Sequence, residues 1–179
     1  MSRKLLALPV AALIIGGLLS AIHMQPARGA DVVTDKQLTL IRNNCTNLKV
    51  TLTRIQNSDL SLRINRDYVY QAIANQLMVP LNQRIASNQL DGTDLIAITA
   101  DFKKADKDYY NAYKSYANAM SNATSIDCTR QPSQFYDAVA EARKQRKSFY
   151  QADQTMVDLM NNYRSKFTAF SKQVKAEQD

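Results

Sequence analysis

Apolar residues recur along most of the chain at alternating steps of three and four, which lines one face of a helix with an apolar seam. The pattern occupies residues 38–55, 95–119 and 135–174. Among the seam positions of the last run, only Arg146 and Asp153 are charged. Seams of this kind are typical of long helices that pack side by side, so the sequence predicts an all-α fold.

After residue 29 glycine and proline are scarce, so few residues there can end a helix. In NQLDGTDL, Gly92 is predicted to stop one helix, and Thr93 is predicted to be the N-cap of the next. Pro132 is predicted in the first turn of the last helix. The apolar pattern resumes on both sides of Pro80, so we expect a kink there rather than a helix end.

The stretch NSDLSLRINRDYVY, residues 57–70, decides how many helices the N-terminal half forms. The first seam continues through it if Asp59 and Arg66 are accepted as polar members. Residues 35–88 would then be one long helix, and the chain would be an elongated up-down-up bundle of three long helices. A break near residues 60–65 would instead give a four-helix bundle.

Two charge pairs favour three helices. Asp59 and Arg66 are seven residues apart, and so are Arg146 and Asp153, with the opposite signs in matching order. The first and third helices of an up-down-up bundle run parallel, so a single offset places Asp59 opposite Arg146 and Arg66 opposite Asp153. We expect a polar layer that either fixes the helix register or binds a small anion. The remaining charged residues of this layer are Arg63, Asp67 and Arg143.

Residues 1–29 are predicted to be an export signal or an N-terminal membrane anchor. Arg3 and Lys4 precede an uncharged apolar run at residues 5–22, and small residues follow it. This order is typical of a cleaved secretory signal, and the run is also long enough to remain as an anchor. In either case residues 30–179 form one exported domain, which meets a membrane only through the N-terminal segment.

The two cysteines, Cys45 and Cys128, are predicted to form a disulfide, because an even pair in an exported chain is normally bonded. The alternative is a pair of buried thiols. The offset that pairs Asp59 with Arg146 also brings Cys45 near the loop that carries Cys128. The disulfide and the ion pairs therefore require nearly the same register between the first and third helices.

The side-chain inventory argues against catalysis. The only histidine, His23, lies in the N-terminal segment, and both cysteines are expected in the disulfide. This excludes general-base catalysis by histidine, nucleophiles activated by histidine and His-rich zinc sites in residues 30–179. The aspartates do not follow the spacing of a calcium loop. We expect no enzyme, and hence no catalytic residue, no metal and no cofactor.

The charge balance is mildly basic. Of the 23 Lys and Arg, three lie in residues 1–29, which leaves 20 against 16 Asp and Glu and a net charge of +4. An unknown partner protein or an anionic envelope polymer would suit such a surface, and no motif indicates specific binding of nucleic acid. Tyr110 and Tyr113 lie beside the middle seam and form a candidate partner patch. The pattern favours no particular oligomeric state.

The segments LTRI, SDLSLRINRDYVYQAI, LMVPLNQRI and IDCTRQPSQFYDAVAEARKQR cover much of residues 41–147. Together they resemble an uncharacterised group of small exported helical proteins from candidate-phylum bacteria of the Saccharibacteria type. The resemblance implies export and a helical fold. It implies no activity and no catalytic residues.

These observations predict an exported, non-enzymatic binding or scaffold protein of the cell envelope or the extracellular space. The alternative is a chaperone-like holdase for exported proteins, which a large exposed apolar cavity would favour. An effector that acts on a membrane would need a helix with a free apolar face. We expect no such face once the seams are buried.

Overall fold

The computed structural model describes residues 33–176, so the predictions for residues 1–29, including the export signal and His23, lie outside the described residues. The described part is helical apart from its turns and contains no strand, which confirms the all-α prediction. The elements in chain order are α1 (Asp35–Asn43), α2 (Cys45–Ala72), the π-helical segment η1 (Ile73–Met78), α3 (Val79–Ser87), α4 (Thr93–Ser125) and α5 (Pro132–Ala176).

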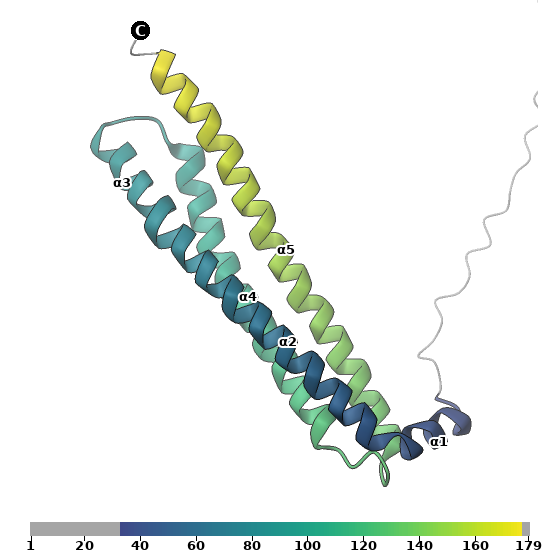
Figure 1. The fold of residues 1–179 in the computed structure, drawn as a ribbon. Coiled ribbons are helices and arrows are strands. Elements are labelled where there is room, and N and C mark those ends of the chain that lie inside the picture. Colours follow the sequence, from purple (N-terminus) through teal and green to yellow (C-terminus); the bar gives the residue numbers. More distant parts are fainter. Residues whose placement is uncertain (1–32, 177–179) are drawn as a thin grey trace, which may run out of the picture. The chain divides into compact units, whose positions relative to one another are not determined.

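Residues 33–176 form an elongated bundle (Figure 1). The segments α2, η1 and α3 follow one another along one rod, α4 returns beside this rod, and α5 runs beside α4. The α4 and α5 helices pack against each other along much of their length. α5 begins at Pro132, as predicted, because proline at the first helical turn needs no N–H donor there.

Residues 35–88 depart from regular α-helical geometry in two places, whereas residues 60–65 are helical within α2. The first interruption is at Asn44, which leaves helical geometry with φ −112° and ψ 14°. Its side-chain amide donates to the carbonyl of Leu40 at 2.9 Å and so competes with the backbone ladder. α1 is therefore a separate short helix.

The second interruption is the π-helical segment η1, which ends directly before the turn that contains Pro80. Proline has no N–H to donate to the carbonyl four residues earlier, and its ring crowds that carbonyl. In the wider π turn the N–H of Val79 bonds the carbonyl of Ala74, and the chain then continues through Pro80 as α3. The expected kink takes the form of this π turn.

The corner between α3 and α4 differs from the expectation at both helix ends, because α3 already ends at Ser87 rather than at Gly92. Gln89 takes the left-handed conformation with φ 56°, and Gly92 is the N-cap of α4. Thr93 is the first residue of α4 rather than its cap, and its hydroxyl donates to the carboxylate of Asp91 at 2.9 Å. Gly92 is required by close packing, because a Cβ there would lie 2.5 Å from Cγ2 of Ile85.

Aromatic rings form the centre of the core. Tyr116 of α4 stacks on Phe149 of α5 with 6.0 Å between ring centroids, and Tyr70 of α2 meets Tyr109 edge to face at 5.4 Å. All four side chains are fully buried. The α4 and α5 seams predicted from periodicity therefore face this core.

The α2 seam drifts away from its predicted positions. Val69, three residues after Arg66 and so on the continued seam, is 42% exposed, whereas the adjacent Tyr70 is fully buried. A straight α-helix turns by about 20° per heptad relative to a strict seven-residue repeat. Each residue turns by about 100°, so Tyr70, eleven residues after the buried Asp59, returns to within about 20° of it around the axis, whereas Val69 lies about 80° away.

Candidate functional site

Cys45 and Cys128 lie at disulfide distance, with 1.93 Å between the sulfur atoms and 5.4 Å between the Cα atoms. Cys45 opens α2, and the fully buried Cys128 lies in the turn between α4 and α5. The pair ties the start of α2 to the end of the bundle where α5 begins.

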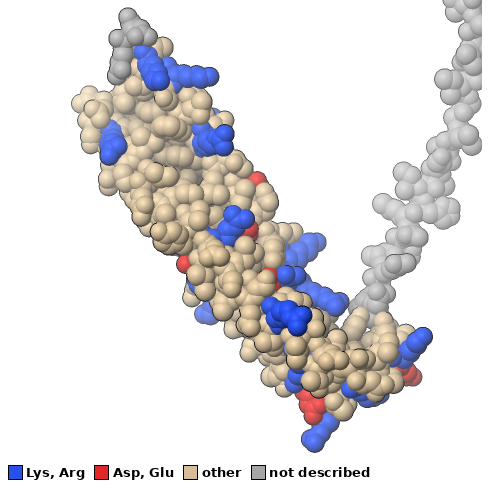
Figure 2. Space-filling model, viewed as in Figure 1, with Lys and Arg blue, Asp and Glu red and all other residues tan. Residues whose placement is uncertain are grey.

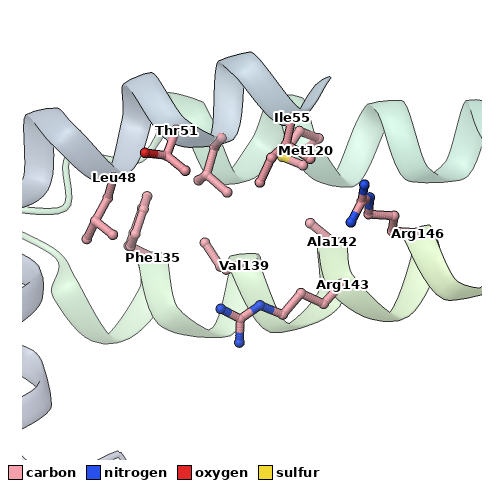
Figure 3. A pocket seen from close by; sticks show the side chains of 10 residues that line it. Leu48, Thr51, Ile55, Met120, Phe135, Val139, Ala142, Arg143 and Arg146 are labelled. Carbon is pink, nitrogen blue, oxygen red and sulfur yellow. The ribbon is translucent and has the colours of Figure 1, made fainter. Parts of the chain in front are cut away.

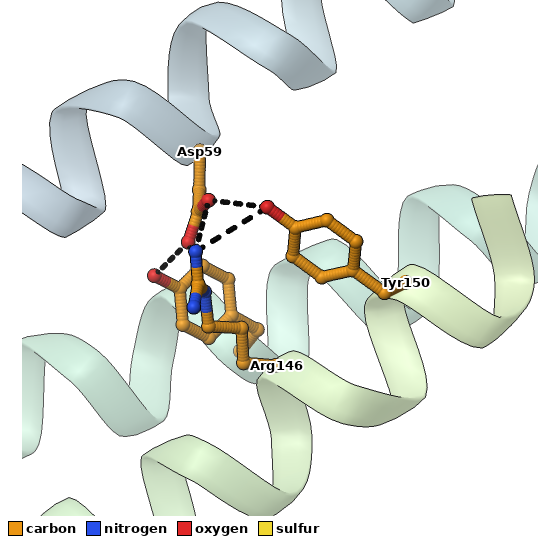
Figure 4. Close-up of polar contacts among 4 residues, drawn as sticks. Asp59, Arg146 and Tyr150 are labelled. Atoms are coloured by element: carbon orange, nitrogen blue, oxygen red, sulfur yellow. Dashed lines mark hydrogen bonds and ion pairs between the residues drawn. The ribbon is translucent and has the colours of Figure 1, made fainter.

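The carboxylate of Asp59 lies at the centre of the predicted polar layer and joins three helices (Figure 4). Arg146 donates to it twice, from Nε to Oδ2 at 2.6 Å and from Nη2 to Oδ1 at 2.9 Å. The hydroxyl of Tyr116 donates to Oδ2 at 2.6 Å, and that of Tyr150 donates to Oδ1 at 2.9 Å. Asp59 is 1% exposed, so these four donors take the place of water.

The electrostatic state of this layer follows from those bonds. Burial alone would raise the pKa of Asp59, but hydrogen bonds from Arg146, Tyr116 and Tyr150 outweigh it and hold the pKa below its usual range. The hydrogen bond to Asp59 raises the pKa of Arg146 despite its partial burial. Burial, together with the bond to Asp59, raises the pKa of Tyr116. The layer is a saturated ion pair whose acceptor positions are all used, which suits a structural role.

A second polar layer lies one heptad further along. The Tyr70 hydroxyl donates to Oδ1 of Asp153 at 2.6 Å, and Nε of Arg66 lies 3.7 Å from the same oxygen. Burial and the bond to Asp153 both raise the pKa of Tyr70. The structure thus brings together both charge pairs that the sequence placed opposite each other.

The other charged residues predicted for the layer lie beside it. Arg63 forms an ion pair with Asp67 at 3.6 Å, and its guanidinium lies over the rings of Tyr110 and Tyr113 at 5.3 and 5.6 Å. These cation–π contacts engage both tyrosines of the candidate patch, although Tyr110 is still 50% exposed. Arg143 stands apart. It is exposed, and no described residue forms a hydrogen bond or ion pair with it.

Sequence reasoning missed the tyrosine hydroxyls that complete the two layers. Spacing alone places Tyr116 within the apolar seam of residues 95–119 and gives no role to Tyr70 or Tyr150. A signal was present, because a buried tyrosine normally finds a partner for its hydroxyl. Asp59 and Asp153, the acidic residues on the facing seams, are such partners for Tyr116 and Tyr70.

An apolar groove of about 220 Å³ lies between α2, α4 and α5, on the disulfide side of the Asp59 layer (Figure 3). Leu48 and Thr51 of α2 face Phe135 and Val139 of α5 across it, and Arg146 stands at one end. No lining residue is acidic. The residues that line it are Leu48, Thr51, Leu52, Ile55, Met120, Phe135, Val139, Ala142, Arg143 and Arg146.

The groove adjoins a second, shallower hollow of about 490 Å³ towards α1. Leu48 and Thr51 line both, and the apolar walls continue through Leu40, Ile41 and Tyr136. The two hollows are therefore neighbours that share these two lining residues.

The outer face of α2 carries an apolar stripe that we did not expect. Leu60, Ile64 and Tyr68 recur at intervals of four residues and are 39%, 52% and 76% exposed. The expectation that no apolar face is left over is therefore wrong. The seams use only one side of α2, and this stripe lies on another.

Lys and Arg side chains are spread along the face shown in Figure 2 rather than gathered into one patch. Within residues 33–176, no group of three or more His, Cys, Asp and Glu side chains is placed to hold a metal ion. In the same range no helix is long and apolar enough to cross a membrane.

The chain was compared with family models, curated proteins and solved structures. No family model matches the chain, and neither a curated protein nor a solved structure matches it.

Proposed function

We propose that the chain is an exported, non-enzymatic binding protein whose ligand site is the groove between α2, α4 and α5. The groove itself is the observation that carries this proposal. The Asp59 layer beside it has every acceptor occupied, whereas the groove presents apolar side chains from three helices to an open space. Concave apolar surfaces of this kind are the usual sites for small ligands.

The scaffold of the proposal is an up-down-up bundle of three long helices, with α2, η1 and α3 acting as a single rod. Two features support this count. Residues 60–65 are helical, and the pairs Asp59–Arg146 and Arg66–Asp153 share one parallel offset. The short α1 is then an appendage at the end of the rod.

Export is supported by two independent features. A cysteine pair at disulfide distance suits an oxidising compartment, because cytosolic thiols are kept reduced. The apolar run at residues 5–22 suits a signal or an anchor. The proposed place of action is the cell envelope or the extracellular space, and the net positive charge favours an anionic ligand or partner.

A fluorescence titration tests the groove as a ligand site. The chain has no tryptophan, so Thr51→Trp places a single reporter at the edge of the groove. We expect the neutral apolar dye N-phenyl-1-naphthylamine to bind and to quench this tryptophan. Val139→Phe should remove binding by filling the groove, while Ala140→Phe, on the exposed adjacent position, should leave it intact. Equal dye binding by both variants would exclude the groove as the site.

A holdase is the second candidate, favoured by the exposed stripe of Leu60, Ile64 and Tyr68. An exposed apolar stripe can hold an unfolded segment of another exported protein. The expected result is slower aggregation of a chemically reduced client, followed by light scattering. Ile64→Lys should abolish this effect, whereas Ile96→Lys, which alters an exposed apolar residue on α4, should not. A chain with no effect on aggregation would rule out this role.

A further inference from the structure

The groove contains one positive charge that nothing in the described structure neutralises. Arg146 lines the groove, but Asp59 compensates its charge through two hydrogen bonds. Arg143 lies one turn earlier on the same helix and also lines the groove, yet no described residue pairs with it. Because the lining also lacks an acidic residue, the charge of Arg143 complements an anionic group on a bound molecule.

The size of the groove suits a narrow apolar chain. A methylene group is similar in size to a water molecule, which occupies about 30 Å³ of liquid, so a groove of about 220 Å³ holds roughly seven of them. The adjoining hollow continues the apolar walls past Leu48 and Thr51. A chain longer than seven methylenes would have to extend past Leu48 and Thr51 into this neighbouring hollow.

The lining helices also disfavour an extended peptide. The backbone groups of α2, α4 and α5 are bonded within their own helices, so the groove offers no row of donors and acceptors. A peptide placed there would bury its own N–H and C=O groups without partners, which is costly. An acyl chain has no such groups to satisfy.

We propose, on the basis of the function proposed above, that the groove binds a free long-chain fatty acid, with the acyl chain against Leu52, Ile55 and Val139 and the carboxylate at Arg143. Arginine binds a carboxylate through two parallel hydrogen bonds, which also orients the chain. The headgroup stays at the exposed edge of the groove while the chain is removed from water.

The test compares three probes in the full-length Thr51→Trp chain: tetradecanoate below its micelle concentration, its neutral methyl ester, and vesicles of anionic phospholipid. We expect tetradecanoate to bind about tenfold more tightly than the ester, the difference expected for charge-assisted hydrogen bonds. Arg143→Gln should remove this preference, and Arg143→Lys should keep part of it. Lys147→Gln removes one charge from an exposed position further along α5 and should leave the preference unchanged.

The outcomes separate the two proposals. If tetradecanoate and the ester bind equally, and both are lost in Val139→Phe, the groove is a ligand site but the fatty-acid assignment is wrong. If neither probe nor the neutral dye binds, the proposed function fails as well. Binding to vesicles without binding to free tetradecanoate would also overturn the assignment, as would an unchanged preference in Arg143→Gln.

Discussion

Asp59→Asn is the sharpest test of the polar layer. The substitution keeps the shape of the side chain but removes its charge and turns one acceptor into a donor. That donor would face Arg146 or a tyrosine hydroxyl, all of which already donate to this position. The site is 1% exposed, so water does not replace the lost partner.

The expected loss of folding stability depends on how far each partner of Asp59 is exposed to water. Removing one member of a buried ion pair costs about 3–5 kcal/mol. The Arg146 side chain is 40% exposed and can turn towards water, which lowers the cost to about 3 kcal/mol. For a chain of this length we expect the Tm to fall by roughly 6–12 °C.

Urea unfolding followed by circular dichroism, with the disulfide intact, measures this cost. Asp108→Asn is the matched control, because Asp108 is exposed on α4 and should change stability by less than about 0.5 kcal/mol. The triple variant Asp59→Leu, Tyr116→Phe, Arg146→Met removes the charges together with the buried hydroxyl and should recover most of the loss. A loss below about 1 kcal/mol for Asp59→Asn would refute the reasoning that the layer is a tightly coupled buried pair.

The pH dependence of this stability has a definite sign. The folded pKa of Asp59 lies below its ordinary value of 3.8, so as the pH falls the unfolded chain takes up the proton first. The contribution of Asp59 is complete above the unfolded pKa and is lost as the pH falls through the folded one. We expect the urea midpoint of the native chain to drop below about pH 4, and to drop less steeply in Asp59→Asn. Parallel curves for the two proteins would contradict this.

Three further predictions concern stability, each measured by urea unfolding. Replacing Cys45 and Cys128 by alanine should cost roughly 4.5 kcal/mol on the chain-entropy model for the 83-residue separation, and an unchanged midpoint would mean that the bond does not form. Gly92→Ala should cost about 1–3 kcal/mol because its Cβ would collide with the side chain of Ile85. In an Ile85→Ala background the colliding atom is gone, so Gly92→Ala should cost less there than in the native chain. Tyr70→Phe should cost about 1–2 kcal/mol by removing a fully buried hydroxyl that bonds the partly buried carboxylate of Asp153, and a neutral effect would argue against that bond.

The long helices and their register were accessible from the sequence because both depend on simple spacing. Apolar residues at steps of three and four specify helices, and charges of opposite sign at equal intervals specify the parallel offset. Asp59 lies against Arg146, and Arg66 lies near Asp153, at that one offset. The position of Pro132 followed from the geometry of proline alone.

The remaining features depend on three-dimensional detail that a linear pattern lacks. The π turn before Pro80 depends on how the chain relieves a local clash, and the turn at Asn44 depends on one side-chain hydrogen bond. Tyr70 rather than Val69 is buried because, at about 100° per residue, Tyr70 lies nearer than Val69 to the direction of Asp59 around the helix axis. The groove could not be predicted, because it is space that the side chains of α2, α4 and α5 leave unfilled.

The two charge pairs also explain how two helices with repeating seams keep one alignment. A seam with a seven-residue repeat tolerates a slip of one heptad, about 10.5 Å, because apolar residues would meet apolar residues again. A slip in one direction would place Asp59 opposite Asp153, and a slip in the other would place Arg66 opposite Arg146. Each slip thus brings two like charges together in place of an ion pair, so the layers disfavour both alternatives even if they contribute little net stability themselves. The alignment that survives is the one that sets α2 beside α5 with the groove between them.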